Sequence, residues 1–231
     1  MKLLALDTSS VACSVALQTE DVTIERHEEQ PREHTRILLP MIESVLAEAA
    51  MKLAELDAIV LGNGPGSFIG MRIGASVAQG LAFGAALPIV PVSSMAAIAV
   101  GILGTEDAKQ VAVAQDARMN QVYLGIYARD ADELPVAVIP ERLHALTAID
   151  ELAGAESGLC VAAGFGWERY PELWAANADR VGRKLEAYYP RARNLLPLGE
   201  AGIAAGEALS PEDLEPTYLR NKVAEIPQTR P

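Results

Sequence analysis

The chain has 231 residues, and 50% of them are hydrophobic, which is enough apolar material for one large domain or two smaller ones. It carries 31 acidic against 19 basic residues, so its formal net charge is −12. A surface of this sign repels the phosphate backbone of nucleic acids, which excludes independent RNA or DNA binding as the expected function.

The sequence predicts neither export nor membrane insertion. The N-terminal apolar run is stopped by Asp7 and is too short for a signal peptide. Residues 73–92 form the longest apolar stretch, but Gln79, glycines and prolines interrupt it, so it predicts a helix followed by a strand. Cys13 and Cys160 lie in apolar runs and are interpreted as core thiols in a reducing compartment. We therefore expect a cytoplasmic protein.

Three short strands are predicted at the N-terminus, over residues 2–7 and 12–17 with a third close behind. Asp7, Thr8 and Ser9 form a polar turn after the first strand. Actin-like ATPases and sugar kinases place a phosphate-contacting turn here, in which the carboxylate holds a metal-bound water. The same residues also make ordinary turns, so both interpretations stay open.

Residues 34–51 carry the apolar stripe of an amphipathic helix. The stripe includes Leu38, Met41, Ile42 and Val45. Pro40 lies too deep for the first turn of a helix that starts at residue 34. We therefore expect either a kink or a delayed start near Ile37.

A glycine-rich turn with Gly64 and Gly66 connects a predicted strand, residues 57–63, to a predicted helix, residues 70–86. Such a turn can present backbone N–H groups to an anion. Its spacing matches neither nucleotide-binding fingerprint: a dinucleotide motif needs glycine where Ser67 stands, and a P-loop needs a lysine that is absent. We favour a tight turn with close helix packing over a phosphate cradle.

The helix over residues 70–86 is apolar or small around nearly all of its circumference. Its polar residues form one narrow line, Arg72, Ser76 and Gln79. A small-residue face includes Gly70, Gly74 and Ala78. Each interior glycine costs about 1 kcal/mol relative to alanine, so the helix is expected to pack closely against the preceding helix or a second protein.

A strand over residues 88–92 and a helix over 94–103 complete the first half, and the polar segment that follows marks a boundary. The chain then restarts with strands at 111–114 and 122–127, and Asp116 follows the first of these as Asp7 does in the first half. Beyond them we expect short strands and a helix within 135–152, a strand at 159–163, and separate helical segments at 192–196 and 199–209.

This order predicts an α/β protein of the actin-like, hexokinase-like ATPase fold, with two related βββαβαβα-type halves of which the second is reduced. The first domain is expected over residues 1–104 and the second over residues 105–231. The C-terminal tail is expected to pack back on the first.

Five stretches of this sequence resemble the TsaB (YeaZ) family of tRNA threonylcarbamoyladenosine biosynthesis proteins, and the resemblance runs through essentially the whole chain. The stretches are Asp7 to Ser9, His34 before Leu38 and Pro40, residues 64–72, Asp116 to Arg118 with Tyr123, and Pro216 to Arg220. Ile69 departs from the pattern, since the family usually has threonine there. The lost hydroxyl weakens a phosphate role for the turn.

The resemblance implies a non-catalytic scaffold subunit, not an enzyme on its own. The complex installs threonylcarbamoyl on adenosine 37 of bacterial tRNAs that read codons starting with A. Its catalytic subunit is the paralogue TsaD, which this chain would bind and support, and it would help to recruit the ATPase TsaE. In isolation a homodimer is expected. The chain would contact tRNA only through the complex, with no tightly bound cofactor and with ATP or ADP at most at a shared interface.

The resemblance also places candidate site residues. The partner interface would use both helices of the first half, through Leu38, Met41, Ile42, Val45, Gly70, Gly74, Val77, Ala78 and Leu81. Vestigial phosphate turns would be formed by Asp7, Thr8, Ser9, Gly64, Gly66 and Asp116. No catalytic residue is assigned.

Two other functions have weaker support in the sequence. TsaD binds a metal through His-x-x-x-His, and the matching positions here hold Ser94 and Ile98, so neither a metal site nor a metallopeptidase is expected. The alternative is an actin-like ATPase or kinase that uses Asp7 and Asp116. Against it, Ala117 follows Asp116 where such turns usually have glycine.

Overall fold

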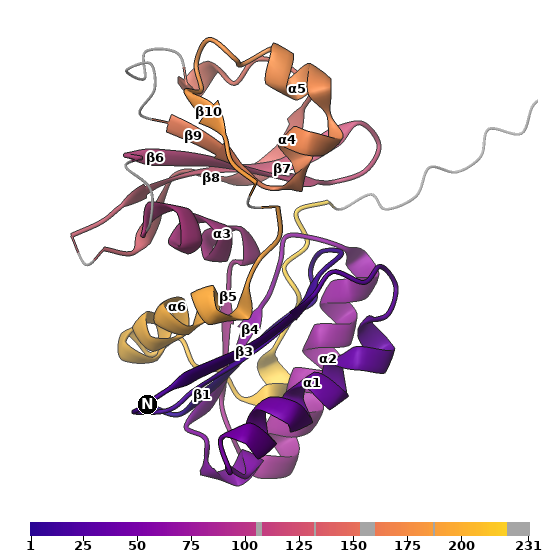
Figure 1. The fold of residues 1–231 in the computed structure, drawn as a ribbon, viewed down its shortest axis with the longest axis vertical. Helices are drawn as coiled ribbons and strands as arrows, with labels where there is room; N and C mark the ends of the chain where they lie inside the picture. The colour runs from indigo at the N-terminus through magenta and orange to yellow at the C-terminus, as the bar shows by residue number, and fades with distance from the viewer. Residues whose placement is uncertain (105–107, 132, 153–159, 187, 221–231) are drawn as a thin grey trace, which may run out of the picture.

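The computed structural model describes residues 1–104, 108–131, 133–152, 160–186 and 188–220, and its ribbon shows two sheets, one above the other in Figure 1. The first sheet has the strand order β3-β2-β1-β4-β5. Its strands are β1 (Leu3–Asp7), β2 (Cys13–Gln18), β3 (Thr23–Glu28), β4 (Ala58–Gly62) and β5 (Ile89–Val92). Strands β1, β4 and β5 run parallel, whereas β1, β2 and β3 form an antiparallel meander.

The second sheet repeats this topology. Its order is β10-β9-β6-β7-β8, with an antiparallel meander of β6, β7 and β8 and parallel pairing of β6 with β9 and of β9 with β10. Its strands are β6 (Gln110–Asp116), β7 (Gln121–Arg129), β8 (Pro135–Ala145), β9 (Cys160–Ala163) and β10 (Arg183–Lys184). The prediction of an actin-like fold with two related halves is confirmed.

Helices cover both faces of the first sheet (Figure 1). Helices α1 (His34–Glu48) and α2 (Phe68–Ala85) pack on one face, where Leu4 and Leu6 point, and α6 (Ala192–Ala205) packs on the other, where Leu3 and Ala5 point. Burial on both faces explains why every residue of β1 and β4 is buried and why these strands are apolar throughout.

The second sheet is covered by α3 (Ser94–Leu103) on one face and by the short helices α4 (Phe165–Arg169) and α5 (Pro171–Ala175) on the other. Single-turn 3₁₀ helices lie at η1 (Leu53–Glu55), η2 (Asp150–Leu152) and η3 (Pro211–Asp213). Across the part of the chain that the structure describes, no helix is long and apolar enough to cross a membrane.

Some expected elements were wrong in detail. Helix α1 begins at His34 and not near Ile37, and it contains Pro40. Its apolar stripe packs on the sheet, and this packing outweighs the backbone hydrogen bond that proline cannot make. Residues 135–145 form one continuous strand, whose pairing with β7 shifts register near Leu124 and Ile126. Helices α4 and α5 were not predicted, because five residues are too few to show a helical period.

The two helical segments expected near the C-terminus are one helix, α6, which contains Pro197. It packs closely on the first sheet: a Cβ atom at Gly199 would lie 2.3 Å from Cγ2 of Val60, and one at Gly202 would lie 2.7 Å from Cγ1 of Val90. The helix thus follows the second sheet in sequence but contributes to the core of the first. The domain boundary at 104/105 stays a prediction, since residues 105–107 lie outside the described ranges.

The substitution Gly199→Ala tests this packing. The added methyl group meets a stiff, buried valine, so we expect the free energy of unfolding to fall by about 1–3 kcal/mol. Gly80→Ala is the control, because nothing lies within 4 Å of a Cβ there, and it should raise stability by up to about 1 kcal/mol. Urea unfolding measures both, and equal stability of the two variants would contradict the placement of α6.

Candidate functional site

The parallel strands of the first sheet bring three turns together. Because β1, β4 and β5 run in one direction, their carboxyl ends meet at one edge of the sheet, where ligands bind in open α/β folds. Asp7 ends β1, Gly62 ends β4, and Ser94 begins the helix after β5. Residues that are distant in the sequence therefore meet at this edge.

The Asp7 carboxylate is buried and fully engaged by its own chain. Its Oδ1 accepts hydrogen bonds from the Ser9 backbone N–H at 2.9 Å and the Ser9 hydroxyl at 2.8 Å, and its Oδ2 accepts one from the Ser94 hydroxyl at 2.6 Å. The Ser94 oxygen in turn accepts the N–H of Gly64 at 3.1 Å. A Cβ atom at Gly62 would lie 2.0 Å from Asp7 Oδ2, so only glycine leaves room for the carboxylate.

Burial also changes the proton affinity of Asp7. Removal from water raises the pKa of its carboxyl group above the ordinary value, and the hydrogen bonds from Ser94 and Ser9 offset part of that rise. Asp7 is thus a desolvated carboxyl group bonded to hydroxyl and amide donors, not a carboxylate open to solvent.

The turn of Thr8 and Ser9 packs directly against the glycine turn. Thr8 donates its hydroxyl to the carbonyl of Gly70 at 2.7 Å, and the Ser9 carbonyl accepts the N–H of Ser67 at 2.6 Å. A Cβ atom at Gly70 would lie 2.0 Å from the Thr8 carbonyl oxygen, and one at Gly66 would lie 2.2 Å from that of Ser9. The candidate phosphate turns of the first half therefore lie in direct contact with one another.

Asp116 occupies the equivalent place in the second half, at the end of β6. Its Oδ1 accepts the N–H of Arg118 at 2.7 Å and the hydroxyl of Tyr170 at 2.8 Å, and its Oδ2 pairs with Arg118 Nη1 at 3.3 Å. Asp7 and Asp116 thus end equivalent strands of different sheets, and each is bonded within its own half.

No metal centre is formed by the described residues, since no three or more His, Cys, Asp or Glu side chains are grouped to hold an ion. The Ser94 hydroxyl already bonds Asp7 and Gly64, and Ile98 lies in the core beneath the second sheet. The nucleotide–metal pair that the ATPase fold implies does not fit the first-half turns, because their polar atoms are spent on one another.

The residues expected at the partner interface differ in how far they are exposed in the single chain. Seven side chains or glycines assigned to it are buried within the chain: Leu38, Met41, Ile42, Val45, Gly70, Gly74 and Ala78. They face the first sheet or the turn of Thr8, which explains their small or apolar character without a partner. Val77 and Leu81 are half-buried.

An exposed apolar groove of about 420 Å³ lies between the outer sides of α1 and α2. Three large side chains keep much of their surface in solvent there, with exposed fractions of 69% for Ile69, 47% for Leu39 and 39% for Phe68. The groove is lined by His34, Thr35, Leu38, Leu39, Phe68, Ile69, Arg72, Ile73, Ser76 and Val77. These side chains thus form a cluster of exposed apolar surface.

One rim of the groove is built with the C-terminal segment. The Arg72 guanidinium carbon lies 3.8 Å from the centre of the Phe68 ring, and Arg72 Nε donates to the Tyr218 hydroxyl at 3.0 Å. The rings of Phe68 and Tyr218 are 5.5 Å apart. Arg72 and Tyr218 were not assigned to the interface from the sequence, although both lie in the stretches that carry the family resemblance.

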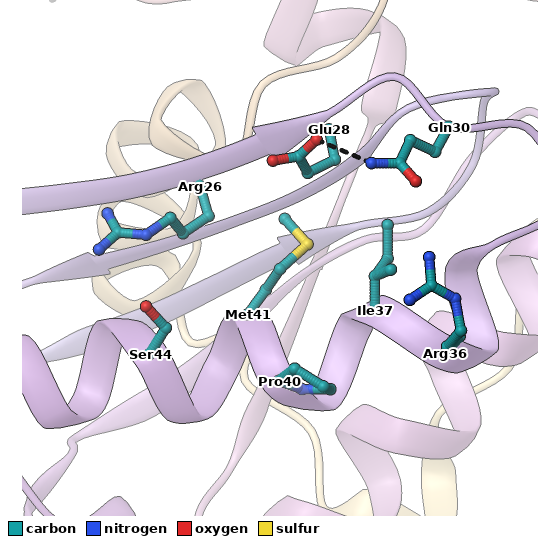
Figure 2. Close-up of a pocket in the computed structure, with 8 residues that line it drawn as sticks. All are labelled: Arg26, Glu28, Gln30, Arg36, Ile37, Pro40, Met41 and Ser44. Carbon is teal, nitrogen blue, oxygen red and sulfur yellow. Dashed lines mark hydrogen bonds between the residues drawn. The ribbon is translucent and has the colours of Figure 1, made fainter.

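A second, smaller cavity of about 310 Å³ lies between β3 and α1 (Figure 2). On the β3 side of this cavity, Gln30 donates to Glu28 at 3.2 Å. Its two arginines have acidic partners within the chain, since Arg26 pairs with Glu48 and Arg36 with Glu33. Both arginines are thus already engaged, and this cavity exposes less apolar surface than the groove between α1 and α2.

The fold defines the class: an α/β protein of the actin-like ATPase type, in which the turn after β1 packs against the glycine turn after β4. The family model of TsaD, described as tRNA N6-adenosine threonylcarbamoyltransferase, matches residues 23–228.

Similarity to known proteins identifies the family within this class. The chain is 39% identical to the tRNA threonylcarbamoyladenosine biosynthesis protein TsaB of Escherichia coli K12, over 97% of this chain and 96% of the relative. It is 36% identical to TsaB of Haemophilus influenzae, over 96% and 95%. The chain belongs to the TsaB family.

Solved structures from Pseudomonas aeruginosa share the fold. One, titled as an uncharacterized protein with similarity to peptidase YeaZ, superposes with a TM-score of 0.85 at 37% identity and covers 95% of this chain and 99% of its own. A second, titled YeaZ, gives a TM-score of 0.80 at 35% identity, over 92% and 98%.

The substitution Asp7→Asn tests the buried carboxyl group. The folded-state pKa of Asp7 is raised, so its contribution to stability is fully present below its unfolded pKa of about 3.9 and is lost as pH rises through the folded value. Asparagine does not titrate. The stability of the variant relative to the parent should therefore increase from pH 4 toward neutrality, as measured by urea midpoints across that range. A difference that stays constant or shrinks would mean that folding does not raise the pKa of Asp7.

Proposed function

We propose that this chain is the scaffold subunit of the complex that installs threonylcarbamoyl on adenosine 37 of tRNAs reading codons that start with A. It takes part in that synthesis by binding the catalytic paralogue TsaD and by helping to recruit the ATPase TsaE. The names of its relatives support a part in threonylcarbamoyladenosine biosynthesis.

The observation that carries the proposal is the exposed groove between α1 and α2. Leu39, Phe68 and Ile69 keep apolar surface in water at a cost that docking would recover, at about 25 cal/mol for each Å² buried. Ile73 and Val77 extend the apolar lining along α2. TsaD is a paralogue that shares the fold, so its own first half offers a similar pair of helices. We place the contact on this outer groove and not on the buried face of the helices.

The closed first-half turn supports a role without catalysis. An ATPase needs an open cradle for phosphate and metal, whereas Asp7 is bonded to Ser9 and Ser94 and Thr8 packs on Gly70. The same contacts argue against the alternative, an ATPase or kinase built on Asp7 and Asp116. ATP or ADP would then bind at an interface shared with a partner.

In isolation the groove is expected to pair with a second copy, because a two-fold contact lets one patch cover itself. TsaD would displace that copy and use much the same surface. The net charge of −12 makes independent tRNA binding unfavourable, so tRNA would be engaged through the assembled complex.

The substitution Ile69→Asp tests the docking surface. A carboxylate in the middle of an apolar contact loses its hydration, so we expect binding to TsaD to weaken at least about a hundredfold and the homodimer to dissociate. Val138→Asp is the matched control, because Val138 is an exposed apolar residue on β8, outside the groove. Calorimetric titration with TsaD and sedimentation equilibrium give the two readouts, and normal binding by the Ile69 variant would move the interface elsewhere.

A reconstituted modification assay tests the role in the pathway. With TsaD, TsaE, tRNA and the threonylcarbamoyl donor present, modification should depend on this chain and should be lost with the Ile69→Asp variant. The purified chain alone should neither modify tRNA nor hydrolyse ATP. Hydrolysis by the chain that disappears on Asp7→Ala would favour the ATPase instead.

A further inference from the structure

Arg72 is the one charged residue among the 18 residues of α2. It is exposed, it lies at the rim of the groove between α1 and α2, and it belongs to a chain with an excess of acidic residues. No carboxylate among the described residues forms an ion pair with it. Its contacts within the chain are with aromatic rings and a hydroxyl group, so its charge is available to an anion from another chain.

The guanidinium group of Arg72 is held in place by two aromatic side chains. It stacks over Phe68 at 3.8 Å and lies 5.9 Å from the centre of the Tyr218 ring. Its Nε donates to the Tyr218 hydroxyl, while the two terminal nitrogens can still form the fork that matches a carboxylate. Such a pre-oriented fork loses little conformational entropy when it binds an anion.

We propose that Arg72 determines the specificity of the groove by taking a carboxylate from a helix of the partner subunit. This inference rests on the docking function proposed above. The apolar groove would bury the non-polar side of that helix, and the acidic residue would meet Arg72 at the rim. Partial removal of water strengthens such a pair, and its directional hydrogen bonds fix the register of the helix.

The same residue disfavours a second copy of this chain. A two-fold contact would place the groove of one copy against the groove of the other. The residues that line the groove include no carboxylate, so Arg72 would lose water without gaining an anionic partner. Arg72 therefore favours the heteromeric contact in two ways: it gains a carboxylate there, and it loses hydration without compensation in the homomeric contact.

A phosphate of tRNA is the other anion that a guanidinium fork fits. The surface beside Arg72 is apolar, formed by residues such as Ile69 and Ile73, and the chain as a whole is acidic. Both features favour the carboxylate of a helix over a polyanion.

The test compares Arg72→Gln with Arg36→Gln, which removes the same charge from an exposed α1 residue that pairs with Glu33 outside the groove. We expect Arg72→Gln to weaken binding to TsaD at least about tenfold and to reduce its salt dependence, while self-association stays equal or becomes tighter. Arg72→Lys keeps the charge but not the fork, so its binding should be intermediate. Arg36→Gln should leave both affinities within about twofold of the parent.

Three results would overturn the inference. TsaD binding could be unchanged by Arg72→Gln. Self-association could weaken as much as TsaD binding, and Glu43→Gln could weaken it equally. That result would mean that Arg72 pairs with the exposed Glu43 of a second copy. The loss could also occur only when tRNA is present, which would assign Arg72 to phosphate. If Ile69→Asp leaves TsaD binding intact, the docking function itself fails; if only Arg72→Gln does so, the inference alone fails.

Discussion

The buried contact between the first hairpin turn and the glycine turn organises this molecule. Asp7 is placed in the core, where a carboxyl group is stable only with hydrogen-bond donors around it, and Ser9 and Ser94 supply them. Position 62 requires glycine, because the Asp7 carboxylate occupies the place where a Cβ atom would lie. Strand β1, the turn after β4 and the start of α3 are thereby fixed to one another, and α2 begins from that fixed point.

The packing of α1 and α2 on the first sheet restricts where the proposed binding surface can lie. The inner faces of α1 and α2 are used by the sheet, so what remains for a partner is their outer side, with Leu39 and Ile69. The C-terminal segment completes this surface and links the halves. Its Thr217 and Tyr218 reach the glycine turn and Arg72, and its Arg220 donates to the carbonyl of Ala117 at 3.0 Å and to Gln121 at 2.7 Å. A partner in the groove would therefore contact a segment that also holds the turn after β6.

Much of the fold could be predicted from the sequence, because its signals are local. Unbroken apolar runs located β1 and β4, the 3.6-residue period located α1, and an aspartate at the end of two strands indicated the duplication. Pro40 and Pro197 lie inside helices that the sequence predicted to start late or to end at them. Sequence propensity alone cannot compare the lost hydrogen bond with the gain from tertiary packing. The two predicted helical segments form the single helix α6 because it packs on a face of the first sheet, at β4 and β5. That face exists only once the sheet has assembled.

For the candidate site, too, some features were predictable from the sequence and others depended on the tertiary structure. The sequence by itself determined which residues are special: the glycines of the turn, Asp7 with its hydroxyl neighbours, and the apolar stripes of two helices. Only the tertiary structure decided what each of them faces. Gly74 is small because Thr8 Oγ1 would lie 2.5 Å from its Cβ, whereas Gly80, with the same local appearance, faces open space. A periodic pattern reports that a face is apolar, but burial depends on which distant segment covers it, and that is set by the packing of the whole chain.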